Sequence, residues 1–110
     1  MSQPSPSSKV SRTGSHVRAT LAGGVVTIHV EGRFDFGCHP DFRHSYEGFG
    51  AVSDYIVDLE ATEYLDSSAL GMLLVLREVA GSGHVRIVNC GPAVRRILEV
   101  ANFNRLFALE

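Results

Sequence analysis

Two short runs of alternating apolar and polar residues open the patterned part of the chain. Residues 17–21 alternate in this way, Gly23 and Gly24 follow, and residues 25–30 are rich in β-branched side chains. Such runs on either side of a Gly-Gly pair are typical of a β-hairpin with a tight turn. Residues 33–37, which follow the second run, are expected to form a loop.

A helical period comes next. Four residues are spaced as i, i+3, i+4 and i+7, which predicts one face of a short amphipathic helix: Phe42, Ser45, Tyr46 and Phe49. Pro40 suits the first turn of that helix, because its fixed backbone angle is already helical.

The rest of the chain alternates between predicted strands and helices. Residues 55–59 form a nearly continuous apolar run, which predicts a central, parallel strand buried on both faces. Further strands are expected at 85–90 and 105–109, and helices at 67–80 and from Pro92 to about residue 101. This alternation predicts a single α/β domain, in which helices pack over a mixed β-sheet.

The helix predicted at 67–80 is apolar around most of its circumference. Between Ala69 and Ala80 its only charged residues are Arg77 and Glu78. A helix of this kind is either buried on both sides or docks a partner, and the sequence leaves both possibilities open. If it docks a partner, the contact residues are expected among Met72, Val75, Leu76 and Val79.

Composition narrows the class of protein. Of the 110 residues, 45% are hydrophobic and 20% charged, with a net charge of −2, as in ordinary globular domains. No basic stripe suggests a nucleic-acid partner, and the longest apolar run, residues 69–76, is too short to cross a bilayer. Residues 1–16 are rich in Ser and Pro and predict a disordered tail before a domain at 17–110.

Cys38 and Cys90 lack the spacing of a redox or metal motif, which favours two reduced thiols. No secretory signal is recognisable, so a cytoplasmic location is expected. His39 and His44 near Cys38 match no standard metal spacing, and no Gly-x-Ser-x-Gly elbow is present. The sequence therefore predicts a non-enzymatic protein without metal or cofactor.

The segment Asp66-Ser67-Ser68 lies between a loop and the apolar helix. A helix start offers free N–H groups and the positive end of the dipole, so a phosphate added there is partly compensated. Ser and Asp are also the preferred capping residues, so a purely structural role fits the same pattern. Asp35 has the same two interpretations, as a turn residue or as a contact for a partner.

These residues resemble a known family. Residues 64–71 (Tyr-Leu-Asp-Ser-Ser-Ala-Leu-Gly), after the strand at 56–59, are similar to the STAS domain of anti-sigma factor antagonists. Residues 32–35 lie where that family has a Gly-x-x-Asp turn. The late helix at 92–98 and the segment 102–107 also match, so the resemblance covers about residues 17–110.

The resemblance implies a phosphorylation switch at Ser67. In the family this serine is modified by a partner that is both an anti-sigma factor and a serine kinase, of the histidine-kinase-like ATPase type. The unphosphorylated antagonist binds this partner, phosphorylation releases it, and a PP2C-type phosphatase resets it. The output is transcription or another bacterial response. Carried over, Asp35, Asp66 and Glu63 surround the phosphate with negative charge, and Ser68 supports the site.

Two departures from the family pattern stand out. Ala69 replaces a common glycine, which favours a firmer helix start, and the chain ends at Glu110 without the final helix of many members. Two other functions remain open. One is a STAS-type sensor that binds a small ligand between the loops of Asp35 and Asp66. The other is a structural subunit of a larger complex.

Overall fold

The computed structural model describes residues 10–13, 16–49 and 52–110. The strands are β1 (Val10–Thr13), β2 (Val17–Ala22), β3 (Val25–Val30), β4 (Gly32–Phe34), β5 (Asp54–Asp58), β6 (Thr62–Leu65), β7 (His84–Val88) and β8 (Ala108–Leu109). The helices are α1 (His39–Tyr46), α2 (Ser67–Ala80) and α3 (Pro92–Val100), with short 3-10 turns η1 (Phe36–Cys38) and η2 (Phe103–Arg105).

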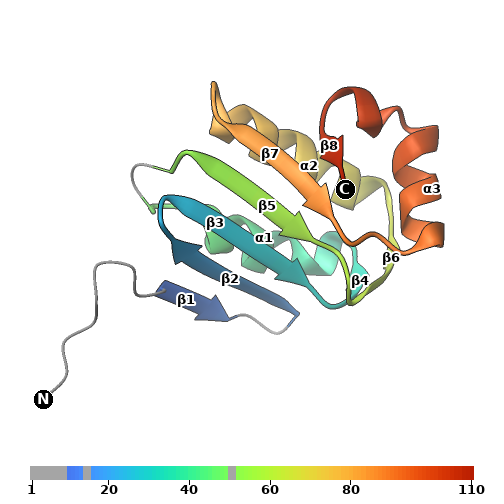
Figure 1. The fold of residues 1–110 in the computed structure, drawn as a ribbon. Helices are drawn as coiled ribbons and strands as arrows, with labels where there is room; N and C mark the ends of the chain where they lie inside the picture. Colours follow the sequence, from blue (N-terminus) through green and yellow to red (C-terminus); the bar gives the residue numbers. More distant parts are fainter. Residues whose placement is uncertain (1–9, 14–15, 50–51) are drawn as a thin grey trace, which may run out of the picture.

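Six strands form a mixed sheet in the order β1-β2-β3-β5-β7-β8 (Figure 1). The β1–β2 and β2–β3 pairs are antiparallel, whereas β5 pairs in parallel with both β3 and β7. At the β2–β3 turn, Gly23 and Gly24 have φ angles of 58° and 77°, which residues with a Cβ rarely adopt. The predicted hairpin, the mixed sheet and the central position of β5 are confirmed.

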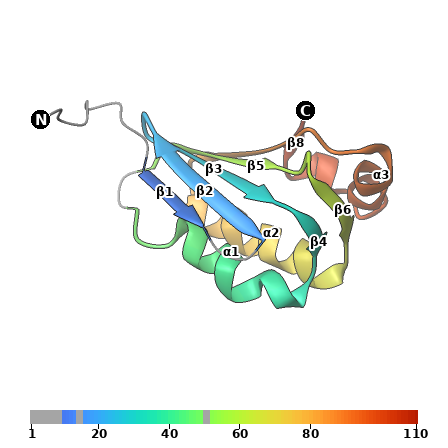
Figure 2. The ribbon, with the colours of Figure 1, turned by 90° about the horizontal axis from the view of Figure 1, so that it is seen from below.

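Helices α1 and α2 lie side by side on one face of this sheet, and Figure 2 shows the sheet above both of them. Helix α3 lies at the far end and contacts β6. The sheet residues that face α1 and α2 alternate with less buried ones, as the pleat requires. They form the core with the inner faces of the helices: Val17, Ala19, Val26, Ile28, Val30, Tyr55, Val57, Val85 and Ile87.

The prediction that β5 is buried on both faces is wrong. Tyr55 and Val57 point into the core, but Asp54, Ile56 and Asp58 lie half-buried on the opposite face, which neither α1 nor α2 covers. Their shielding comes from neighbouring strands. A short apolar run does not distinguish a strand covered by helices on both sides from one shielded on one side by its neighbours.

Two predicted irregular segments contain strands. Val10–Thr13 form β1 along the edge of β2, which contradicts a disordered tail over these residues, whereas residues 1–9 and 14–15 lie outside the described part. The expected loop at 33–37 contains the end of β4 and the turn η1. In the described part of the chain, no helix is both long and apolar enough to cross a membrane.

Candidate functional site

Strands β4 and β6 form a separate two-stranded parallel sheet that brings two loops together. Arg33 pairs with Tyr64, and Phe34 pairs with Leu65. The N–H of Asp66 donates to the carbonyl oxygen of Phe34 at 3.3 Å. Asp35 therefore follows one strand end and Asp66 the adjacent one, so the two acids predicted for the site lie at the same edge.

Each of these acids caps the helix or turn that follows it. The Oδ1 atom of Asp66 accepts a hydrogen bond from the N–H of Ala69 at 3.1 Å, at the first turn of α2. The Oδ1 atom of Asp35 accepts from the N–H of Gly37 at 3.0 Å, at η1. The capping interpretation is thus correct for Asp66, and Asp35 has the structural role expected of a turn residue; each retains a second oxygen, Oδ2, for other partners.

Ser67 is the first residue of α2, and its side chain is exposed. Ser68 is half-buried and lines a groove between α1 and α2. The two neighbouring hydroxyls therefore differ in access: a macromolecule approaching the start of α2 meets Ser67 more readily than Ser68.

Helix α2 has one buried and one open side. Val75 and Val79 are each 52% exposed, and Met72 is largely buried but lines the groove. Leu76 was expected among the partner contacts, and this is wrong: its side chain is 0% exposed because it lies on the face that packs into the core. The helix is therefore not buried on both sides, and docking of a partner on its open side stays a prediction.

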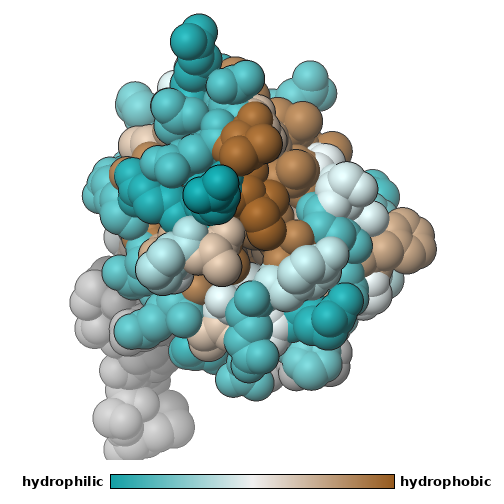
Figure 3. Space-filling model, turned by 90° about the vertical axis from the view of Figure 1, so that its right-hand side faces the viewer, coloured by the Kyte–Doolittle hydropathy of each residue, from teal (hydrophilic) through white to brown (hydrophobic). Residues whose placement is uncertain are grey.

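Apolar side chains are also exposed at the other end of the domain. Figure 3 shows a band of hydrophobic surface on the side of the molecule where α3 lies. Val100 on α3 is the most exposed large apolar residue described, at 76%, and Leu74 and Leu106 are also exposed. The Nε atom of Arg77 on α2 donates to the carbonyl oxygen of Leu106 at 3.0 Å, which ties α2 to the segment after η2.

The groove between α1 and α2 has a volume of about 830 Å³. Its lining is mainly aromatic and aliphatic, from Phe42, Tyr46 and Tyr55 to Met72 and Val75, as in many ligand pockets. The lining also includes Phe36 and Ser68, the residues that directly follow Asp35 and Ser67. The groove is therefore continuous with the loops of the candidate site.

Arg33 is a site residue for which the sequence pattern predicts no role. Its Nε atom lies 3.4 Å from Oδ2 of Asp35, and its guanidinium stacks over the ring of Tyr64, 4.6 Å from the ring centroid. The residue stands in the Gly-Arg-Phe-Asp turn, but its contact with Tyr64 depends on the β4–β6 pairing, which was not predicted. The site is thus less purely acidic than expected.

The two cysteines are free and lie apart from Ser67 in the sequence. Cys38 is buried, and its thiol donates to the carbonyl oxygen of Arg33 at 3.1 Å. Burial raises the pKa of the Cys90 thiol, which favours its neutral form. Within the described residues, no cluster of three or more His, Cys, Asp or Glu side chains is arranged to hold a metal ion.

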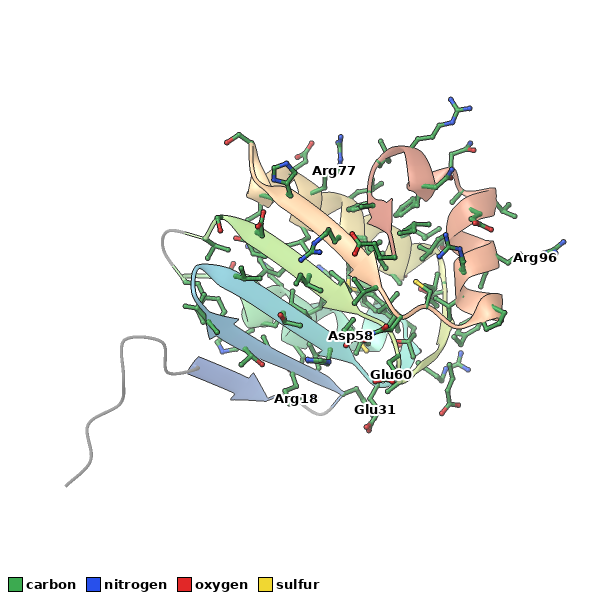
Figure 4. All side chains as sticks on the ribbon, viewed as in Figure 1. Arg18, Glu31, Asp58, Glu60, Arg77 and Arg96 are labelled. Atoms are coloured by element: carbon green, nitrogen blue, oxygen red, sulfur yellow. The ribbon has the colours of Figure 1, made fainter. Side chains whose placement is uncertain are left out.

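The open face of the sheet carries two His–Asp contacts between directly opposed residues. His29 on β3 lies 3.4 Å from Asp58, and His84 on β7 lies 3.4 Å from Asp54, both acids being on β5. Figure 4 shows Asp58 and Glu60 close together at the carboxyl end of β5. Both oxygens of Asp58 have partners, because Asn89 and the N–H of Glu60 also donate to it.

Residues 16–110 match the STAS domain. A STAS-domain-containing protein of Pseudomonas aeruginosa (strain UCBPP-PA14) is 50% identical over 91 residues, which span 80% of this chain and 90% of that protein. An anti-sigma factor antagonist from Mycobacterium paratuberculosis superposes with a TM-score of 0.70 at 26% identity, covering 97% of this chain and 89% of the other. The phosphorylated Bacillus cell fate determinant SpoIIAA has the same fold, with a TM-score of 0.61 at 20% identity over 94% and 91%.

Proposed function

Because this chain belongs to the STAS domain family, we propose that it is an anti-sigma factor antagonist whose partner binding is switched by phosphorylation of Ser67. In this proposal the unphosphorylated protein binds an anti-sigma factor that is also a serine kinase of the histidine-kinase-like ATPase type. Phosphorylation releases the protein, and a PP2C-type phosphatase restores it. The output is transcription or another bacterial response.

The observation that carries the proposal is the position of Ser67. Its exposed side chain opens α2 next to Asp66, and the half-exposed Val75 lies on the same helix two turns away. A charge added at Ser67 therefore falls at the end of an apolar surface that a partner can cover. Contact between like charges across an interface costs roughly several kcal/mol. A loss of about 2.7 kcal/mol of binding free energy already weakens binding a hundredfold.

The chemistry of the switch is a phosphoryl transfer. The Ser67 Oγ attacks the γ-phosphorus of ATP bound by the partner kinase, the bond to the β-phosphate oxygen breaks, and ADP leaves as the serine proton goes to a base of the kinase. This chain supplies the acceptor and its docking surface, not the catalytic groups. The reaction adds about −1.5 to −2 charges at the start of α2.

Two relatives of known structure support this interpretation. The protein from Mycobacterium paratuberculosis is described as an anti-sigma factor antagonist, and SpoIIAA has been solved in both unphosphorylated and phosphorylated forms. The proposal transfers that mode of action to this chain.

The test is phosphorylation by the cognate kinase with ATP, followed by mapping of the modified residue by mass spectrometry. We expect one phosphate, on Ser67, and none in a Ser67→Ala variant. Ser68→Ala is the matched control, because it removes the neighbouring hydroxyl and leaves the acceptor in place. Phosphate on Ser68 alone, or none when the kinase modifies a control substrate, would contradict the switch.

The groove between α1 and α2 favours a second function, that of a sensor for a small apolar ligand. Its volume of about 830 Å³ and its aromatic lining suit such a ligand. Because Ser68 lines the groove, a ligand bound there would lie next to Ser67. Ligand-dependent thermal stabilisation that persists in Ser67→Ala and disappears in Val75→Trp, which fills the groove, would support this alternative.

A further inference from the structure

Arg33 and Ser67 lie at the same edge of the β4–β6 sheet. Arg33 is opposite Tyr64 in the register, and Ser67 comes three residues after Tyr64, just beyond the strand end. The N–H of Asp66 donates to the carbonyl oxygen of Phe34, so the residues that follow these two, Ser67 and Asp35, come from the same end of the strand pair. The guanidinium of Arg33 already reaches toward Asp35 along this edge.

The guanidinium of Arg33 contacts both Tyr64 and Asp35, but not all of its N–H groups have hydrogen-bond partners among the described residues. Its plane lies over the Tyr64 ring, its Nε faces Oδ2 of Asp35 at the long distance of 3.4 Å, and the side chain is 69% exposed. Its terminal Nη groups form no hydrogen bond with any described residue. An exposed pair of this kind contributes little, at most about 1 kcal/mol, so it exchanges readily for a stronger partner.

We propose that Arg33 is the intramolecular partner of the phosphate on Ser67, exchanging its contact with Asp35 for the phosphate oxygens when the site is modified. The inference rests on the proposed switch and adds a structural device to it. Stacking on Tyr64 orients the edge of the guanidinium, and its N–H groups form the bidentate fork that suits a phosphate.

Asp35 still has a hydrogen-bond partner after the exchange. The carboxylate of Asp35 keeps its hydrogen bond from the N–H of Gly37 through Oδ1, while the phosphate offers three acceptor oxygens and about twice the charge. One oxygen of Asp66, Oδ1, caps α2 through the N–H of Ala69, and this cap is the same with or without the phosphate.

The exchange changes the surface that a partner meets. In the unmodified protein this edge presents an exposed cation, and in the phosphorylated protein that cation is neutralised against the phosphate. Phosphorylation therefore removes a positive feature as well as adding a negative one. The partner of the unmodified form is expected to place an acidic group against Arg33, which the phosphorylated form no longer binds.

The test uses full-length protein carrying phosphoserine at position 67, incorporated by codon reassignment so that no kinase is needed. The phosphorus-31 resonance is followed from pH 4 to 8 in wild type, Arg33→Gln, Arg33→Lys and the control Arg96→Gln. Arg96 projects outward from α3 (Figure 4). Its substitution removes the same positive charge as Arg33→Gln, but at a position away from Ser67. The acidic residues of this part of the fold, Asp35, Glu63 and Asp66, are unchanged in every variant.

We expect the midpoint of the second phosphate ionisation to move up by about half a pH unit in Arg33→Gln, less in Arg33→Lys, and not measurably in Arg96→Gln. A midpoint in Arg33→Gln equal to that of wild type would overturn the inference. Failure of a kinase to modify Ser67 would instead overturn the switch and leave this titration unchanged.

A second measurement needs no variant. In wild-type protein labelled with nitrogen-15, the Nε–H resonance of Arg33 should shift and become protected from exchange when Ser67 is phosphorylated, whereas that of Arg96 should not. An unchanged Arg33 resonance in the phosphorylated protein would contradict the pairing even if Arg33→Gln failed to fold.

Discussion

The N–H of Asp66 donates to the carbonyl oxygen of Phe34, so the loop before α2 is fastened to the end of β4. Through this bond Asp66, which precedes the proposed phosphorylation site Ser67, and Phe34, which precedes Asp35, belong to one hydrogen-bonded unit. The arrangement separates two roles of Asp66. Its backbone joins the strands, and its side chain caps the helix.

Asp66→Ala should destabilise the protein by about 1 kcal/mol, because the N–H of Ala69 loses its acceptor. Asp66→Asn should restore most of this stability, since asparagine caps as well as aspartate but carries no charge. Urea unfolding measures both. Equal destabilisation by Ala and Asn would mean that charge at the helix dipole, and not the cap, is what Asp66 contributes.

Substitutions at Leu76 and Val75 should affect stability differently, because one side chain lies in the core and the other at the surface of α2. Leu76→Ala is expected to cost about 2–5 kcal/mol of unfolding free energy, because the side chain is completely buried. Val75→Ser should change stability by no more than about 0.5 kcal/mol, since both residues have similar helix propensity and the site is half exposed.

Val75→Ser should still weaken kinase-partner binding by about fivefold, the loss expected for about 1 kcal/mol of apolar contact. Calorimetric titration with the purified partner measures it. Arg86→Gln, on the open face of the sheet, is the control and should bind like wild type. Unchanged binding by Val75→Ser would place the partner elsewhere than on this helix.

Substitutions at Ser67 should affect binding and stability in different ways. Ser67→Ala is expected to bind the unphosphorylated partner like wild type, and Ser67→Asp to bind at least tenfold more weakly. The negative charge of Asp at the first position of α2 should nevertheless stabilise the fold by about 0.3–1 kcal/mol. Weaker binding together with a destabilised fold would point to misfolding and not to a charge switch.

Alkaline pH should destabilise the protein in two steps. Burial raises the pKa of Cys90 above 9.0, and burial also raises the pKa of Tyr46 and Tyr55 above 10.0. A raised pKa means that the folded state holds its proton more tightly, so these groups lower stability only as pH rises above their unfolded values.

The free energy of unfolding should therefore begin to fall above about pH 9, and more steeply above about pH 10. Cys90→Ser should abolish the first part of the decline and leave the second. Urea unfolding at a series of pH values from 7 to 11 would show it. A decline that starts at the same pH in the variant would exclude Cys90 as its origin.

Strong local signals account for what the sequence predicted. Helix α2 begins at Ser67 and ends at Ala80 as expected, because a capping acid precedes it and Gly81 follows it. The Gly-Gly hairpin and the start of α3 at Pro92 are equally local features. At these positions a few adjacent residues determine the backbone, and no distant contact is needed.

Distant pairing accounts for what the sequence did not predict. Thr62–Leu65 are too few to show a clear period, and they become a strand only because β4 lies beside them. The role of Arg33 depends on the same pairing, through its contact with Tyr64. The depth of Leu76 likewise depends on which side of α2 meets the sheet, and an all-apolar helix does not reveal this.

The pairing of β4 with β6 joins segments that are far apart along the chain; the Thr62 hydroxyl, for example, bonds to the carbonyl oxygen of Val30, 32 residues away. Such a pairing forms only when a long loop closes, which costs entropy that a local turn does not. Ser67 therefore acquires its neighbours from β4 only once this long-range pairing has formed. A kinase that recognises those neighbours would also discriminate between finished and unfinished copies of this protein.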